Sequence, residues 1–188
     1  WSAEYGVWQI GTPSSVECHG GTQCAGTMLD GNYPLNTNSR LVSPPVQIPA
    51  TAGEEEIRLR FWHNFSYASG DYGVVQISVY QDGSGWLEYT TLSGQLLHSS
   101  AGGWSRTDID LSEYSGQWVK VAFLHTSDRY SPTSAGWYID DIEILKLVPE
   151  FSGSFEDGWG DWSAEYGGWQ IGTPSSVECH GGTQCAGT

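Results

Sequence analysis

The chain has 188 residues, of which 22 are acidic and only seven are Lys or Arg, so its formal net charge at pH 7 is −15. This composition excludes nucleic-acid binding, which needs clustered basic residues to neutralise phosphates, and it disfavours anionic membranes for the same reason. No apolar run approaches the roughly 18 residues of a membrane-spanning helix, so the sequence predicts no membrane insertion.

A stretch of 27 residues occurs twice in the chain. Residues 1–27 read WSAEYGVWQIGTPSSVECHGGTQCAGT, and residues 162–188 repeat them with one change, from Val7 to Gly168. Packing tolerates many substitutions and does not preserve such identity, so the repeat indicates a recent tandem duplication. The offset is 161 residues (162 minus 1), an ordinary domain size. Other copies of the same repeat are therefore predicted partners.

Each copy carries one pair of cysteines, Cys18 with Cys24 and Cys179 with Cys185, in the sequence CHGGTQC. Two cysteines per repeat favour a disulfide within the repeat, and a disulfide would place the chain in an oxidising, extracellular setting. The alternative is a metal site that uses both thiolates with His19 or His180. Zinc sites usually draw on two closely spaced cysteine pairs, and the repeat has no second pair, so we prefer the disulfide.

The sequence between the two copies predicts short strands. Residues 56–65 alternate between apolar and polar side chains, which is the period of a half-buried strand. The other predicted strands alternate in the same way or are bounded by turn residues; they are 46–48, 73–80, 86–92, 104–111, 118–126 and 136–147. Short strands, frequent turn signals and the lack of a helical period predict an all-β fold, an antiparallel β-sandwich or jelly roll.

Three stretches of the chain resemble a bacterial extracellular module. Residues 155–174 (FEDGWGDWSAEYGGWQIGTP) resemble the opening strand of MAM-like jelly-roll domains. Residues 24–48 resemble a pattern of the accessory sandwich domains found beside secreted metalloproteases of the immune inhibitor A type, and residues 127–144 resemble the last strand of those domains. The resemblance implies a galactose-binding-like, MAM-like sandwich in tandem repeat.

The resemblance also implies where the domains begin and end. In such modules the first strand, with its Phe-Glu pair, lies beside the last strand, with its Asp-Asp pair. We therefore expect a domain at 1–147 that lacks its own first strand, a linker at 148–153, and the start of the next repeat at 154–188. The last strand of the first domain would then have an open edge, to which the segment around Phe155 of this or another copy would bind by strand complementation.

A structural Ca²⁺ is a further implication of the resemblance. Its ligands would be Asp140 or Asp141, Glu156, and loop carbonyls or Asp71, and hard oxygen ligands suit this acidic chain. Adjacent residues of a regular strand point to opposite faces, so Asp140 and Asp141 are not expected to serve one buried site together. The alternative is that Asp141 accepts backbone hydrogen bonds or pairs with Arg129.

Four aromatic residues that fall in or beside loops are candidates for binding a sugar ring; they are Trp86, Trp104, Tyr130 and Trp159. The alternative is that these rings close the ends of the sandwich. The chain contains no HExxH, GxSxG or phosphate-loop motif. His63 and His125 fall on interior strand positions, where core residues are expected. We therefore predict no catalytic residues and no enzyme.

Together these expectations predict an extracellular, cell-surface protein whose sandwich units join head to tail into a fibre, stalk or adhesin stabilised by calcium. One alternative is a carbohydrate-binding or adhesive module, in which repetition raises the avidity for glycans. Another is an accessory domain of a secreted protease or glycosidase.

Overall fold

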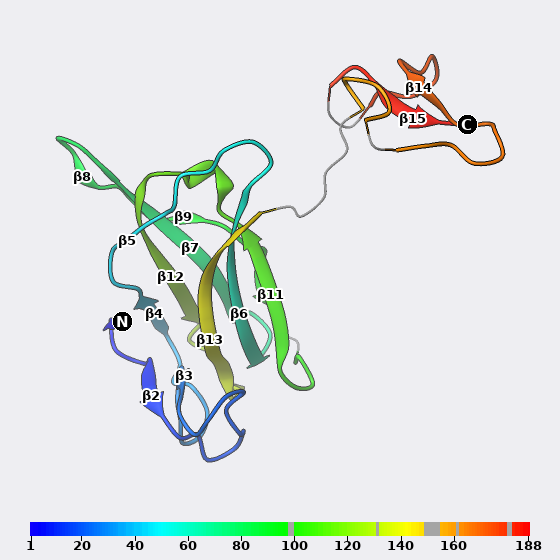
Figure 1. Cartoon of the computed structure of the whole chain (residues 1–188). Coiled ribbons are helices and arrows are strands. Elements are labelled where there is room, and N and C mark those ends of the chain that lie inside the picture. The colour runs from blue at the N-terminus through cyan, green and yellow to red at the C-terminus, as the bar shows by residue number, and fades with distance from the viewer. Residues whose placement is uncertain (98–99, 131, 149–154, 161, 180–181) are drawn as a thin grey trace. The chain divides into compact units, whose positions relative to one another are not determined.

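The computed structural model describes residues 1–97, 100–130, 132–148, 155–160, 162–179 and 182–188 (Figure 1). The chain forms two compact units, Trp1–Val148 and Pro149–Thr188, and each is described by itself. Apart from its first residue, the predicted linker at 148–153 lies outside the described residues, as does His180. Within the described ranges, no helix has the length and apolar character needed to cross a membrane.

The long strands of the first unit follow the alternation of the sequence. In β6 (Glu56–Ser66), Ile57, Leu59 and Phe61 are buried and the residues between them are partly exposed. This is the pattern of a strand with one face on a core. The other long strands match the predicted ranges to within a residue or so at each end; they are β7 (Tyr72–Gln81), β11 (Ser105–Asp110), β12 (Trp118–Ser127) and β13 (Gly136–Leu147).

These strands belong to two antiparallel sheets. The eight-stranded sheet has the order β1 (Ser2–Glu4), β4 (Thr37–Val42), β12, β7 and β10 (Leu96–Leu97), with β5 (Val46–Gln47) paired to β12, and with β8 (Gly85–Trp86) and β9 (Thr90–Thr91) paired to β7. The five-stranded sheet has the order β11, β6, β13, β3 (Cys24–Gly26) and β2 (Gln9–Gly11). A short 3₁₀ helix (Ser112–Tyr114) follows β11.

The core of the first unit lies between the two sheets, where aromatic rings from both sheets meet. The ring of Phe123 on β12 lies 5.1 Å from that of Phe61 and 5.5 Å from that of Trp137 on β13, edge to face in both cases. Trp137 and Phe123 are fully buried, and edge-to-face pairs of this kind stabilise a core beyond the area that they bury. The predicted all-β, antiparallel sandwich is confirmed.

Two histidines are buried in this core. His63 of β6 accepts a hydrogen bond at Nδ1 from Trp137 Nε1 (3.2 Å). His125 of β12 lies within hydrogen-bond distance of the hydroxyls of Tyr67 and Thr37. Burial lowers the pKa of both imidazoles to about 4, because the charged form is poorly solvated there. The prediction that these two histidines are core residues is confirmed.

The second unit has the same substructure as the start of the first. Its strands β14 (Gln170–Gly172) and β15 (Cys185–Gly187) place Gln170 opposite Gly187, as β2 and β3 place Gln9 opposite Gly26. In the first unit the hydroxyl of Thr12 donates to the carbonyl of Thr22 (2.7 Å), and the equivalent bond recurs in the second unit at 2.8 Å. The hairpin with the disulfide therefore folds alike in both copies, whereas residues 163–165, the repeat of β1, form no strand.

Both cysteine pairs form disulfides, Cys18 with Cys24 and Cys179 with Cys185. The predicted pairing within each repeat is confirmed. The alternative of a thiolate metal site is wrong, because bonded sulfur atoms are not available as thiolate ligands.

Candidate functional site

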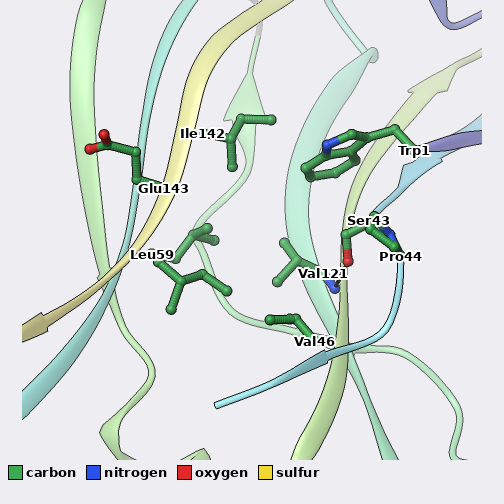
Figure 2. A pocket seen from close by; sticks show the side chains of 9 residues that line it. Trp1, Ser43, Pro44, Val46, Leu59, Val121, Ile142 and Glu143 are labelled. Carbon is green, nitrogen blue, oxygen red and sulfur yellow. Dashed lines mark hydrogen bonds between the residues drawn. The ribbon is translucent and has the colours of Figure 1, made fainter. Parts of the chain in front are cut away.

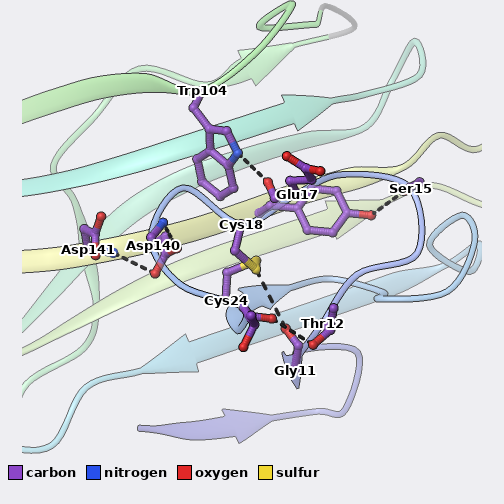
Figure 3. The surroundings of a disulfide bond; sticks show 12 residues. Gly11, Thr12, Ser15, Glu17, Cys18, Cys24, Trp104, Asp140 and Asp141 are labelled. Carbon is purple, nitrogen blue, oxygen red and sulfur yellow. Dashed lines mark hydrogen bonds between the residues drawn. A yellow bond between two sulfur atoms is a disulfide. The ribbon is translucent and has the colours of Figure 1, made fainter.

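The loop closed by the first disulfide is bound to the middle of β13 (Figure 3). The backbone N–H of Gly20 donates to Asp140 Oδ2 (3.0 Å), and His19 Nδ1 lies 2.7 Å from Asp141 Oδ2. Two adjacent residues of the loop are thus bound to two adjacent residues of the strand. We call the cluster of His19, Trp62, Trp104, Asp140 and Asp141 the disulfide-loop site.

A β-bulge explains how neighbouring aspartates both reach this loop. Asp140 lies opposite Trp62, but the next paired residue, Glu143, lies opposite Arg60, so β13 has one extra residue at this point. Asp141, inside the bulge, has a φ of +46°. A bulge bends the strand and re-aims a side chain. The expectation that the two carboxylates point to opposite faces is wrong, because it assumed a regular strand, and Asp141 is paired with His19 instead of Arg129.

Aromatic rings complete the disulfide-loop site. His19 stacks on Trp62 of β6, with ring centroids 3.9 Å apart and planes 15° apart, and the ring of Trp104 lies edge-on to His19 at 5.9 Å. Trp104 Nε1 donates to the carbonyl of Glu17 in the loop at 2.7 Å (Figure 3). The sequence prediction did not include Trp62. Its position between the buried Phe61 and His63 was the signal, because alternation places it on the solvent face.

Ion pairs cover the same face of the sheet farther along β6. Arg60 donates through Nε and Nη2 to the two carboxylate oxygens of Asp108 on β11 (2.9 and 3.1 Å). This bidentate contact holds the pKa of the Asp108 carboxyl below its ordinary value. Arg58 lies 2.6 Å from Glu56 and 3.4 Å from Asp110. Partly exposed pairs contribute little to stability, so their main effect is to give this face a polar surface beside the aromatic cluster.

Asp71, one of the predicted calcium ligands, directly precedes β7 of the eight-stranded sheet. It does not belong to the disulfide-loop site. It is fully buried. Tyr33 Oη (2.6 Å) and the backbone N–H of Asp128 (2.7 Å) donate to its two carboxylate oxygens. Burial and this carboxylate raise the pKa of the Tyr33 phenol. Hydrogen bonds therefore compensate the buried carboxylate, as a buried polar group requires.

Glu156, another predicted ligand, belongs to the second unit. Its carboxylate accepts hydrogen bonds from the backbone N–H groups of Thr183 (2.8 Å) and Gln184 (2.7 Å), and these bonds lower its pKa. The one described group of three potential ligand side chains consists of Asp140 and the two cysteines of the first disulfide. Such a set does not fit an ion that takes six to eight oxygen ligands. Calcium binding by Asp140, Asp141, Glu156 and Asp71 stays a prediction.

Trp104 is one of the four aromatic residues that were predicted to bind sugar. Trp86 and Tyr130, which also belong to the first unit, lie apart from it. Trp86 of β8 packs edge-on against Tyr80 at 5.4 Å, and Lys120 Nζ lies 4.4 Å from the Trp86 ring. Tyr130 is exposed after β12, with the Arg129 guanidinium 5.0 Å from its ring. Trp159 belongs to the second unit. The rings of the first unit therefore share no common platform, and Trp104 is the one that joins the disulfide-loop site.

An apolar groove opens between the two sheets beside Trp1 (Figure 2). It has a volume of about 240 Å³, and its lining includes Trp1, Val46, Leu59, Val121, Ile142 and Ile144. The ring of Trp1, about half exposed, lies 5.9 Å from that of the buried Phe123. Sequence reasoning missed this groove because its lining comes from strands far apart in the chain. Its composition suits an apolar side chain.

The sequence comparisons find one curated relative and no family model. Over 139 residues, or 73% of the chain, the sequence is 34% identical to Bacillopeptidase F of Bacillus subtilis (strain 168), and the match covers 9% of that protein. No family model matches the chain. The chain is therefore similar to a short part of a much longer peptidase. Membership of the MAM-like family and a tandem array stay predictions.

Three solved structures resemble the chain at low identity. The module TmCBM61, in complex with β-1,4-galactotriose, is 16% identical with a TM-score of 0.43, over 77% of this chain and 91% of that one. A carbohydrate-binding module of the β-sandwich superfamily is 12% identical with a TM-score of 0.47, over 77% and 55%. SGBP-B from a xyloglucan utilization locus of Bacteroides uniformis is 14% identical with a TM-score of 0.42, over 76% and 46%. Similarity this low carries no conclusion about ligands.

Proposed function

We propose that the chain is a non-catalytic accessory β-sandwich of a secreted protein whose peptidase lies in another domain. The observation that carries this proposal is the 34% identity over 139 residues to only 9% of Bacillopeptidase F. A match of that length corresponds to one domain and is close to the size of the first unit. A domain similar to so small a share of a peptidase is expected to act beside the catalytic domain.

The disulfides support an extracellular setting for this domain. Both cysteine pairs are bonded, and stable disulfides form in oxidising compartments outside the cytosol. The histidines support a role without catalysis. His63 and His125 are buried and hydrogen-bonded within the core, whereas a general base must reach its substrate.

Glycan binding is a second candidate, and one observation favours it. Trp104 is partly exposed at the disulfide-loop site, where its ring and the half-exposed carboxylate of Asp141 both lie against His19. Arg106 of β11 lies opposite Trp62 in the same sheet. Sugar sites combine the face of an aromatic ring with a few polar side chains that hold hydroxyl groups. Assembly into a fibre is a separate hypothesis, which rests on the repeat in the sequence.

A single set of measurements tests both candidates on the full chain with its disulfides intact. We expect no hydrolysis of casein, and hydrolysis that disappears in the variant His19→Ala would contradict the accessory role.

For glycan binding, retention on immobilised β-galactans and xyloglucan is compared between the chain and Trp104→Ala. The matched control is Trp118→Ala, which removes an exposed tryptophan from the other sheet. Equal retention by both variants would contradict a glycan site at Trp104.

A further inference from the structure

A polar hollow lies beside β1 and β4 of the eight-stranded sheet. It has a volume of about 460 Å³, and its lining is polar apart from one aromatic ring; it consists of Tyr5, Asn36, Thr37, Asn38 and Arg40. This lining shares no residue with the groove beside Trp1. The disulfide-loop site belongs to the other sheet, so the hollow is a separate feature of the first unit.

Arg40 is held in the hollow without a carboxylate. Its Nε donates to the amide oxygen of the buried Gln76 on β7 (2.9 Å), and its guanidinium lies 5.1 Å from the ring centroid of Tyr89. On the other sheet, Arg58 and Arg60 both contact carboxylates. Among the described residues, Arg40 has no ion pair, and its two Nη groups donate no hydrogen bond. The guanidinium is therefore fixed on one side and has donors left for a ligand.

Glu4 brings an acceptor to the same place. It lies directly opposite Arg40 in the pairing of β1 with β4, and residues opposite each other in an antiparallel pair share one face of the sheet. Within the part of the chain that the structure describes, its carboxylate has no hydrogen bond or ion pair. Burial and the Glu4 charge raise the pKa of the Tyr89 phenol, and the Arg40 charge lowers it. A donor and an acceptor thus lie near one ring, and neither satisfies the other.

The side chains around this pair are also available. The amides of Asn36 and Asn38 are exposed, and neither makes a hydrogen bond with a described residue. Tyr5 is 82% exposed and has a φ of +58°. This conformation is costly for a residue with a side chain, and strain of this kind is typical of sites that hold a ligand. The turn after β1 therefore keeps an exposed ring beside a polar hollow.

We infer that this hollow binds one sugar unit of a neutral glycan. A hydroxyl group both donates and accepts hydrogen bonds, so the hydroxyls of one sugar accept from Arg40 and donate to Glu4 at the same time. An anionic ligand would face the charge of Glu4, and a cationic ligand would face that of Arg40. The amides of Asn36 and Asn38 supply further polar contacts, and the Tyr5 ring covers an apolar face of the sugar.

The inference rests on glycan binding, the second candidate for the function of the chain, and it gives that function a site without Trp104. The first test measures binding of the full chain, with its disulfides intact, to an array of β-galactans, β-glucans, mannans and glycans that carry uronic acids. We expect binding to neutral members of the array. The variant Arg40→Gln should weaken it by about 30-fold, the loss expected for hydrogen bonds from a charged group.

The variant Trp104→Ala, measured on the same array, separates the two sites. Weaker binding by Trp104→Ala, with Arg40→Gln equal to the parent, overturns the inference and leaves glycan binding in place. A parent chain that binds no member of the array overturns both.

The variant Tyr5→Gly separates a binding role of the ring from a structural one. Glycine adopts a positive φ without steric cost, so the melting temperature should not fall, whereas glycan binding should weaken by about 5-fold, the loss of one aromatic contact. The matched control is Tyr166→Gly. Tyr166 repeats Tyr5, is exposed at a positive φ, and belongs to the unit whose described strands are β14 and β15. It should leave binding unchanged, and equal binding by the two variants overturns the inference.

The variant Glu4→Gln tests why the hollow selects neutral sugars. It keeps a hydrogen-bonding side chain opposite Arg40 but removes the negative charge. Glycans with uronic acids should therefore bind the variant at least about 10-fold more tightly than they bind the parent, because a repulsion between like charges is lost. An unchanged ratio of acidic to neutral glycan binding would contradict a sugar held between these two side chains.

Discussion

Lowering the pH from 7 to 5 should destabilise the first unit through its two buried histidines, His63 and His125. Burial lowers the pKa of each to about 4, whereas a histidine in the unfolded chain has a pKa of about 6.5. Between these values the unfolded chain binds protons that the folded chain does not. Stability is therefore greatest above pH 6.5 and falls as the pH drops towards 4.

The size of the effect follows from the shift. A pKa of about 6.5 in the unfolded chain and about 4 in the folded chain corresponds to a loss of about 3 kcal/mol in the free energy of unfolding per histidine, once the pH lies below both values. At pH 5 about 2 kcal/mol of this is expected for each, so the two together lower the free energy of unfolding by about 4 kcal/mol. That is a large part of the total stability of an ordinary domain. The pKa of Asp108 lies below its ordinary value because of Arg60. Its contribution to the free energy of unfolding is therefore lost only below the pH range of this experiment.

The assay is urea unfolding followed by tryptophan fluorescence at pH 7 and pH 5. The variant His63→Asn keeps an acceptor for Trp137 Nε1 in place of Nδ1 and cannot be protonated. We expect it to be less stable than the parent at pH 7 but to lose only about half as much stability between pH 7 and pH 5. The double variant with His125→Gln should be almost independent of pH in this range.

An equal loss of stability in the parent and the double variant would refute this reasoning. It would mean that other groups titrate between pH 5 and pH 7. A smaller loss in the parent, with both histidines still buried, would mean that their pKa values are closer to the ordinary value.

Three further predictions concern the disulfide, one glycine and calcium. Cys18→Ser should lower the free energy of unfolding of the first unit by about 2 kcal/mol, because the bridge closes a short loop; an unchanged urea midpoint would contradict this. Gly136→Ala should cost at least about 3 kcal/mol, because its Cβ would overlap Thr27 Oγ1 at a positive φ, whereas Gly83→Ala, with the same sign of φ and open space around it, should cost about 1 kcal/mol. If calcium binds at the aspartate pair, about 1 mM CaCl₂ should raise the melting temperature of the parent and not that of Asp141→Asn; an identical response would argue against these ligands.

The strands could be predicted because the period of two is a local signal. β6, β12 and β13 begin and end within one or two residues of the predicted ranges, since burial on one face requires alternation. The short strands β1, β2, β3 and β10 were missed, because two or three residues carry no period of their own. The six-residue β4 was also missed, because its burial does not alternate regularly, and the predicted strand 86–92 is two short strands, β8 and β9. Such strands depend on the partner beside which they lie.

The site was only partly predictable for the same reason. The disulfides follow from cysteine spacing, and Asp140, Asp141 and Trp104 do lie together. The bulge that turns both carboxylates towards one loop depends on how β13 pairs with β6, which no local pattern of residues reveals. The partnership of His19 with Trp62 joins residues 43 positions apart (62 minus 19) and likewise arises only from the fold.

We expect the two copies of the repeat to compete for the same edge of β13 during folding. β13 accepts β3 by pairing Ile139 with Ala25, but Ala186 lies in a second hairpin of the same register. The second copy lies nearer to β13 along the chain, and the shorter loop favours it by about 0.8 kcal/mol.

The one residue that differs between the copies opposes this preference. Val7 is buried in the first unit, and its N–H donates to Ser39 Oγ, whereas Gly168 is exposed. Burial of a valine is worth about 1.5 kcal/mol or more, which exceeds the advantage of the shorter loop. We therefore expect this one side chain to decide which of the two nearly identical hairpins completes the sandwich, and Val7→Gly should yield a refolded mixture of both.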